Sequence, residues 1–237
     1  MSHYAVAVIH RPDQDIDDML APYDENIRVA PYVEYTKQEA IDYVRKEWTG
    51  YQDKTDEECY EAIAEDYREN DLVDESGSLY STYNTNSKWD WYEIGGRFSN
   101  LLKGKDGLRY DEGCIRNMDF SMNRETYNHS LRFWDVAVDN KPLEPGETKE
   151  QFITFYNENY FRTYYKDREA YAKTMASFST YAVVTPNGVW HAKGKMGWWG
   201  CSSETPEEAN DWEENYLERF INHADEDMMI TIVDCHI

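Results

Sequence analysis

The chain has 237 residues, with 47 Asp or Glu against 24 Lys or Arg, which gives a formal net charge of −23. Its 20 Tyr, 8 Trp and 8 Phe argue against intrinsic disorder, because acidic chains that stay unfolded are poor in aromatic residues. A charge of this sign repels phosphate backbones and anionic lipid, so neither direct nucleic-acid binding nor membrane binding is expected.

The N-terminal region and the cysteines indicate a reduced, soluble environment. The only early apolar run, residues 4–9, is too short for a signal peptide or a spanning helix, so we expect a cytoplasmic protein. No C-x-x-C pair occurs, which argues against a zinc ribbon, and reduced thiols are the expectation. We expect no metal site and no cofactor, since no ligand spacing supports one. The four cysteines are Cys59, Cys114, Cys201 and Cys235.

Hydrophobic periodicity, capping residues and turn residues predict the elements in chain order. The first half should contain a strand at 3–9, a short helix ending at Pro22, a strand at 27–33, a helix from Thr36 to Trp48, an acidic helix after Gly50 and a loop at 70–87. The second half should contain a strand at 133–138, a loop at 139–147, a long aromatic helix inserted at 148–176, a hairpin around Asn187-Gly188, a second acidic helix from Thr205 and a strand at 229–235.

This order of elements predicts a single α+β domain over residues 1–237, with a mostly antiparallel sheet and packed helices. The helices should include two with acidic faces and the long aromatic one. Strands near both ends of the chain, and a hairpin between helices, carry this expectation.

The negative charge is concentrated in three stretches. Residues 13–25, 53–75 and 204–227 carry net charges of −6, −9 and −9, so the other 177 residues together carry +1. The acidity is therefore a local property of parts of the chain.

Two of these stretches are predicted helices with a separate acidic ridge. Thr55 and Glu58 have capping-box spacing, and Thr205-Pro206 is a strong helix start. Two interpretations remain open: a solvated face, or a surface that imitates a row of phosphates and docks on a basic partner. The candidate partner-binding residues are Glu57, Glu61, Glu65 and Glu69 on the first helix and Glu207, Asp211, Glu214 and Glu218 on the second.

The first candidate ligand-binding segment spans residues 88–98. Paired glycines let the backbone approach a ligand closely, an arginine can clamp an anion, and aromatic rings can stack on a base. The alternative is an aromatic core strand that turns at the glycines, with Arg97 paired to Asp90. The ligand-binding candidates here are Asp90, Trp91, Tyr92, Gly95, Gly96 and Arg97.

A second segment, residues 190–200, holds three glycines, three tryptophans, two lysines and no acid. Such a segment in an acidic protein is a candidate anion site, since glycine-rich loops bind anions through backbone N–H groups. The alternative is a packed turn with exposed lysines. The ligand-binding candidates here are His191, Lys193, Lys195 and Trp198.

The third segment is Asp234-Cys235-His236. Strand alternation places Asp234 and His236 on one face and Cys235 on the other, which argues against a Cys–His nucleophilic pair of these neighbours. His236, oriented by a carboxylate, could act as an acid or base, or it could be a hydrogen-bonded structural residue.

These motifs together resemble a family of uncharacterised proteins from bacteriophages and bacterial mobile elements. The resemblance rests on KWDWY with GGR at 88–97, WH with KG and MGW at 190–198, the ending TIVDCHI, and LAPYDEN at 20–26. It implies an accessory viral protein that works in the host cytoplasm, and it implies no catalytic residue.

Two functions are consistent with the sequence. The first is an anti-defence inhibitor, which uses its acidic surfaces to bind a host nucleic-acid-processing or immune complex, with salt-sensitive association. The alternative is a pocket protein that binds a nucleotide-like anion and either sequesters it or hydrolyses it with His191, His236, Asp90 or Asp234. The sequence favours the inhibitor and leans away from an enzyme.

Overall fold

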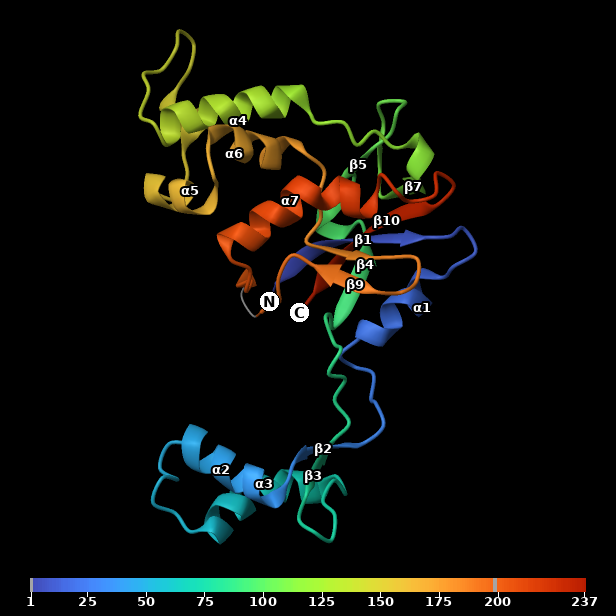
Figure 1. Cartoon of the computed structure of the whole chain (residues 1–237), viewed down its shortest axis with the longest axis vertical. Coiled ribbons are helices and arrows are strands. Elements are labelled where there is room, and N and C mark those ends of the chain that lie inside the picture. The colour runs from blue at the N-terminus through green and yellow to red at the C-terminus, as the bar shows by residue number, and fades with distance from the viewer. Residues whose placement is uncertain (1, 198–199) are drawn as a thin grey trace. The chain divides into compact units, whose positions relative to one another are not determined.

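The computed structural model describes residues 2–197 and 200–237, and Figure 1 shows its ribbon. The chain forms two compact units where one domain over 1–237 was expected. The larger unit consists of Met1–Ala21 and Lys88–Ile237, and the smaller one of Pro22–Ser87. In the sequence, the smaller unit is thus inserted between α1 (Ile16–Leu20) and β4 (Trp91–Ile94) of the larger one. Helices combined with mostly antiparallel strands confirm the predicted α+β class.

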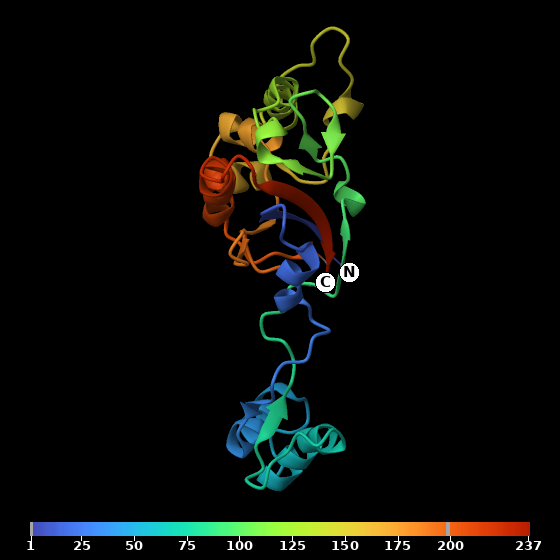
Figure 2. The same ribbon diagram turned by 90° about the vertical axis from the view of Figure 1, so that its right-hand side faces the viewer.

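The larger unit is built around one mixed sheet with strand order β4-β10-β1-β8-β9, and β7 also pairs with β10. All described pairs in it are antiparallel except β1 with β8. Figure 2 shows β10 as a long, bent strand. The predicted terminal strands and the hairpin are confirmed. The strands are β1 (His3–His10), β4 (Trp91–Ile94), β7 (Glu112–Cys114), β8 (Ala182–Val184), β9 (Trp190–Ala192) and β10 (Met229–His236).

The central strands β1 and β10 are buried on both faces, which explains their nearly continuous apolar sequences. On one face, Ile9 and Ile232 pack with Trp212 and Tyr216 of α7 (Pro206–Phe220) in the main core. His3, Asp234 and His236 share this face by alternation but lie beyond that core.

A helical layer beside α7 corrects two predictions. Residues 133–138 are predicted as a strand, but 133–137 complete α4 (Arg124–Ala137), whose N-cap is Asn123 and whose C-cap is Val138. The long helix predicted at 148–176 is broken into η4 (Lys149–Phe152), α5 (Glu158–Tyr164) and α6 (Arg168–Ala176). It breaks because Asn157 and Asp167 each accept a backbone N–H as N-caps and so start new helices.

An aromatic cluster joins α4, α5 and α6 through Trp134, Phe161 and Tyr171. Aromatic periodicity across 148–176 therefore reflects this shared core and not one continuous helix. The remaining short elements of the larger unit are α1 (Ile16–Leu20), η2 (Gly96–Phe98), β5 (Leu102–Lys103), β6 (Arg109–Tyr110) and η3 (Ile115–Asn117), and η1 (Ala21–Tyr23) lies at the boundary.

The smaller unit packs two helices on a two-stranded sheet. The capping boxes predicted at Thr36 and Thr55 are both present. The strand predicted at 27–33 starts later, and the loop predicted at 70–87 contains a strand. Its core includes Val44, Ile63 and Leu79. The elements are β2 (Tyr32–Tyr35), α2 (Lys37–Glu47), α3 (Asp56–Glu69) and β3 (Leu79–Ser81).

The four cysteines are unpaired in the structure, with Cys59 and Cys235 buried and Cys201 exposed. In the described part of the chain, none of the helices combines the length and the apolar character needed to cross a membrane.

Candidate active site

Three aromatic rings meet where β1, β10 and β4 lie side by side. His3 pairs with His236 in the β1–β10 register, and His236 pairs with Trp91 in the β10–β4 register. The two imidazole centroids are 4.9 Å apart with the rings at 72°, and Trp91 stacks on His236 at 5.1 Å and 17°. Register-paired residues project to the same face, so strand pairing alone brings these rings together.

Each histidine in this cluster is oriented by its own carboxylate. His3 Nδ1 lies 2.9 Å from Asp234 Oδ1, and His236 Nδ1 lies 2.6 Å from Asp90 Oδ1. An ionised carboxylate only accepts hydrogen bonds, so each Nδ1 carries the hydrogen and Nε2 of the neutral ring is the basic nitrogen. We call His3, His236, Asp90 and Asp234 the paired-histidine site.

The backbone at the glycines of the first segment packs closely against Asp234. Arg97 N donates to Asp234 Oδ2 at 2.9 Å, so both carboxylate oxygens of this buried residue have partners. Gly96 has φ +51°, and a Cβ there would lie 2.5 Å from Asp234 Cβ. Glycine is therefore required at position 96, because only a residue without a side chain fits over the carboxylate.

Solvent reaches the paired-histidine site unevenly. The side chains of His236 and Asp234 are 5% and 2% exposed, whereas those of His3 and Asp90 are 12% and 29% exposed. Trp91 is exposed and covers one face of His236. The site is thus a shielded cluster with an accessible edge at Asp90 and Trp91.

The acid-free second segment also reaches this end of the sheet. Ser2 Oγ donates to Gly197 O at 3.2 Å, and Gly200 N donates to Ser2 Oγ. Burial, followed by repulsion from Lys195, lowers the pKa of Lys88. Parts of all three sequence motifs therefore converge around the start of β1 and the end of β10.

The other candidates of the second segment lie elsewhere. His191 and Lys193 line a cavity of about 550 Å³ beside α7, together with Asp211 and Arg219. The candidate Trp198 lies outside the described residues. The second segment is therefore divided between two places on the sheet.

Tyr92 faces away from the histidines and donates its hydroxyl to Asp17. Gly95 is buried, and its N–H donates to Ile232 O at 2.8 Å, which fixes the turn after β4. Of the first-segment candidates, Asp90 belongs to the site and Trp91 stacks on His236. Gly96 lies close to Asp234, and Arg97 binds Asp234 through its backbone N–H. The predicted ligand-binding candidates of this segment therefore do not all face the histidines, since Tyr92 lies on the opposite face of the sheet.

Sequence reasoning missed His3. A lone histidine at the start of a strand has no local signal of function, and its partner is 231 positions away. Only the antiparallel register of β1 with β10 places it beside His236. The only clue in the sequence was strand alternation, which places His3 on the same face of the strand as Ala7 and Ile9.

The acidic ridges are exposed on both helices, as predicted. On α3, Glu61 pairs with Arg68 at 2.6 Å and Glu57 lies 3.8 Å from Lys37. The remaining residues of that ridge, Glu65 and Glu69, are exposed.

On α7, Asp211 pairs with Arg219 at 2.7 Å and Glu218 contacts His223 at 2.8 Å. Glu207 and Glu214 are exposed on the same helix. Local partners thus partly neutralise both ridges.

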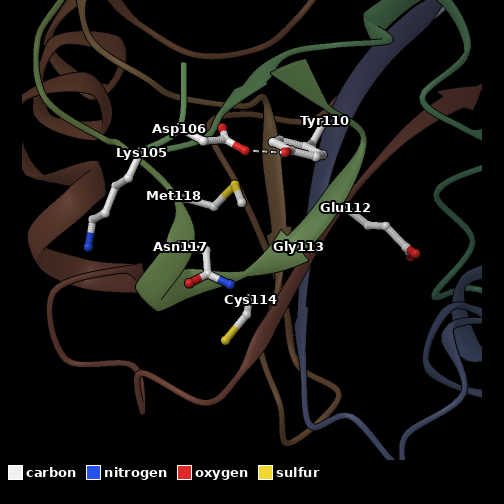
Figure 3. A pocket seen from close by; sticks show the side chains of 8 residues that line it. All are labelled: Lys105, Asp106, Tyr110, Glu112, Gly113, Cys114, Asn117 and Met118. Atoms are coloured by element: carbon white, nitrogen blue, oxygen red, sulfur yellow. Dashed lines mark hydrogen bonds between the residues drawn. The ribbon is translucent and has the colours of Figure 1, made fainter. Parts of the chain in front are cut away.

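Figure 3 shows a cavity of about 520 Å³ that lies away from the predicted residues, beside β6, β7 and η3. Three of its polar side chains bond within the protein: Tyr110 donates to Asp106 at 2.6 Å, and Lys105 Nζ donates to the Arg116 carbonyl at 2.6 Å. The Cys114 thiol donates to the Glu226 carbonyl at 3.2 Å. The Lys105 contact links the β5–β6 hairpin to η3.

Among the described residues, no group of three or more His, Cys, Asp or Glu side chains is arranged to hold a metal ion. The chain matches no protein-family model, and neither the curated proteins nor the solved structures contain a match.

Proposed function

We propose that the paired-histidine site is an acid–base centre that hydrolyses a phosphodiester bond in a nucleotide-like anion. The observation that carries this proposal is the contact between two imidazoles, each with Nδ1 held by a carboxylate. Nε2 of neither ring has a hydrogen-bond partner among residues 2–197 and 200–237. A substrate has to reach these nitrogens from the accessible edge of the site, since the side chains of His3 and His236 are 12% and 5% exposed.

Two adjacent histidines suit this chemistry because phosphodiester hydrolysis needs a base and an acid. Nε2 of the neutral ring takes a proton from water, the water oxygen bonds to phosphorus, and the bond from phosphorus to the leaving oxygen breaks. The protonated ring gives its proton to that leaving oxygen. The products are a phosphomonoester and an alcohol, and solvent exchange restores the two protonation states.

The two rings are in contact, so one can act as the base and the other as the acid on the same substrate. The carboxylates stabilise the imidazolium that forms at each step. Trp91 is exposed and offers a surface on which a base can stack, and Arg97, whose backbone N–H binds Asp234, has an exposed cationic side chain. These features support a nucleotide-like substrate.

The experiment is incubation of the protein with a panel of linear and cyclic dinucleotides, followed by mass spectrometry. Wild-type protein should convert at least one of them, and His3→Ala and His236→Ala should each lower the rate by about 100-fold or more, the typical contribution of one acid or base. His223→Ala is the matched control, because this exposed histidine pairs with Glu218 away from the cluster. Absence of conversion by the wild type, or full activity in both variants, would contradict the proposal.

The smaller unit supports a second function, the docking of a basic partner. Residues 22–87 contain 17 acidic and 6 basic side chains, a net charge of −11. The ridge of α3 lies on its exposed side. With the resemblance to bacteriophage proteins, this charge favours an accessory viral protein that works in the host cytoplasm and blocks a nucleic-acid-processing or immune complex.

A further inference from the structure

The strand β4 forms one edge of the main sheet, and its outer side is open. It stands at the end of the strand order β4-β10-β1-β8-β9, and Figure 2 shows it in green beside the red strand β10. Three of its four residues are exposed, including Trp91 at 43% and Ile94 at 48%. An open edge presents backbone N–H and C=O groups that can pair with another extended chain.

The register with β10 identifies the backbone groups on this outer side. Gly95 N donates to Ile232 O at 2.8 Å, and alternation along an antiparallel pair then directs the N–H and C=O of Glu93 toward β10 as well. The N–H and C=O groups of Tyr92 and Ile94 therefore point away from β10. None of these four groups has a hydrogen-bond partner in the part of the chain that the structure describes.

Glu93 places an unpaired charge at the centre of this edge. Its side chain is exposed and lies on the same face of the sheet as Trp91, whereas Tyr92 and Ile94 lie on the other face. Among the described residues, no Lys, Arg or His lies within ion-pair distance of Glu93. A residue of an added strand opposite Glu93 would occupy a non-hydrogen-bonded position, where Cα atoms are about 4.5 Å apart and side chains are in contact.

The same charge disfavours pairing of this edge with a second copy of the chain. In the antiparallel register with the fullest overlap, Tyr92 pairs with Ile94 of the other copy, and the two Glu93 carboxylates lie directly opposite each other. Like charges at opposed positions are destabilising, and each chain also carries a net charge of −23. A strand with a basic residue opposite Glu93 is attracted for the same reason.

We propose that the edge of β4 binds an extended peptide of a partner protein as an added antiparallel strand with the pattern apolar–Arg–apolar. Its two apolar residues pair with Tyr92 and Ile94 through backbone hydrogen bonds, which is how an added strand gains affinity. Its arginine lies opposite Glu93, where a guanidinium binds a carboxylate through two parallel hydrogen bonds. The diagonal neighbour on that face is Trp91, whose exposed ring stacks on His236 and offers a cation–π contact to the arginine.

The test uses the peptide acetyl-Thr-Val-Arg-Val-Thr-amide and the whole protein. Backbone NMR should show saturable binding that slows hydrogen exchange at the amides of Tyr92 and Ile94, because these amides gain partners. The amide of Glu93 is already directed at β10 and should change little. The same peptide with glutamate in place of arginine should bind about fivefold more weakly, because like charges then lie opposite each other.

Methylation of single peptide nitrogens separates strand addition from attraction between side chains. Both valine N–H groups of the peptide point toward β4, so N-methylation of one valine should weaken binding about tenfold or more. N-methylation of the arginine is the matched control, because its N–H points away from β4 and binding should stay unchanged.

A charge reversal tests the residue that selects the peptide. Glu93→Lys should make the glutamate peptide the tighter ligand, whereas Glu112→Lys, at the exposed start of β7, should keep the preference for the arginine peptide. The proposal is overturned by no binding of the arginine peptide, by binding that leaves exchange at Tyr92 and Ile94 unaltered or tolerates valine N-methylation, or by an unchanged preference in Glu93→Lys. Dimerisation of the protein alone that protects the same two amides would also overturn it, since a second copy would then occupy the edge.

Discussion

At the scale of single residues, the site depends on side chains that are far apart in sequence and fixed by hydrogen bonds. Asp234 is the central example, because its two oxygens accept from His3 Nδ1 and from Arg97 N. The Asp234 carboxylate fixes the His3 ring, and the backbone at residues 96–97 must come close to it. Gly96 allows this approach because it has no side chain.

Gly96→Ala should destabilise the protein more than an ordinary glycine substitution. The new Cβ would meet Asp234, and alanine at φ +51° adds backbone strain of about 1–3 kcal/mol. Gly188→Ala is the matched control, since Gly188 has φ +77° with nothing within 4 Å of its Cβ position. Chemical denaturation of both variants measures the difference, and equal loss of stability would mean that the contact with Asp234 is unimportant.

The carboxylates also predict the hydrogen position on each ring. Nitrogen NMR of histidine-labelled protein should show His3 and His236 with hydrogen on Nδ1 when neutral, since each Nδ1 faces a carboxylate. Asp90→Asn, at a partly exposed position, should change the signals of His236 and leave those of His3 largely unaltered. Hydrogen on Nε2 of both rings in the wild type would contradict the assigned geometry.

At the scale of elements, the sequence predicted those that carry their own signals. Capping boxes at Thr36 and Thr55, the Asn187-Gly188 turn and the β-rich terminal strands all appear as expected. The breaks in 148–176 have a local cause, the N-caps Asn157 and Asp167, which the aromatic pattern outweighed in the prediction. At 133–138 and 148–176 the spacing of the aromatic residues also reflects packing between neighbouring helices, which a local pattern does not reveal. For the same reason the sequence indicated His236 and Asp90 but missed His3, whose role depends on strand register.

The loop after α4 offers a test of one ion pair. Hydrogen bonds from Arg132, and then one from the backbone of Glu144, lower the pKa of Glu147 from 4.5 to about 2. A lowered folded-state pKa gives stability that is present above about pH 4.5 and is lost as the pH falls toward 2. Glu147→Gln should therefore be less stable than the wild type at pH 7, and the difference should shrink between pH 4.5 and 2.

Denaturant titrations across this pH range measure the effect. Glu144→Gln is a useful control, because the Glu144 carboxylate lies 4.0 Å from Arg132, which is too far for a hydrogen bond. A wild-type advantage over Glu147→Gln that did not change with pH would exclude this ion pair as its source.

At the scale of the whole molecule, the smaller unit carries more negative charge per residue than the larger one. The smaller unit contains roughly a quarter of the residues and nearly half of the net charge. It has its own core, and Asn84 Nδ2 donates to the carbonyls of Pro22 and Asp24, which ties its two ends together. The larger unit, which carries the paired-histidine site, spreads the remaining net charge of −12 over 171 residues.

Residues 22–87 expressed alone should fold cooperatively, and added salt should raise their melting temperature by screening the repulsion within a charge of −11. Circular dichroism during heating measures both effects. A fragment that unfolds without a transition, or that salt destabilises, would contradict independent folding of this unit.

The docking function predicts that charge reversal on α3 matters. Changing Glu57, Glu61, Glu65 and Glu69 to Lys should abolish the salt-sensitive capture of a basic partner from host lysate, followed by mass spectrometry of what is retained. The same four-charge reversal of Glu207, Asp211, Glu214 and Glu218 on α7 is the matched comparison. Equal capture by both variants and the wild type would rule out the ridges.

The acid–base site is the central claim, and its most direct test is the dependence of kcat/KM on pH for a dinucleotide that the wild type converts. The rate should fall at low pH, where the base is already protonated, and at high pH, where the acid has lost its proton, giving a bell-shaped profile. His3→Gln should lower the maximum and remove one limb. A profile that is flat across this range, or a bell unchanged by His3→Gln, would contradict a reaction carried by the paired histidines.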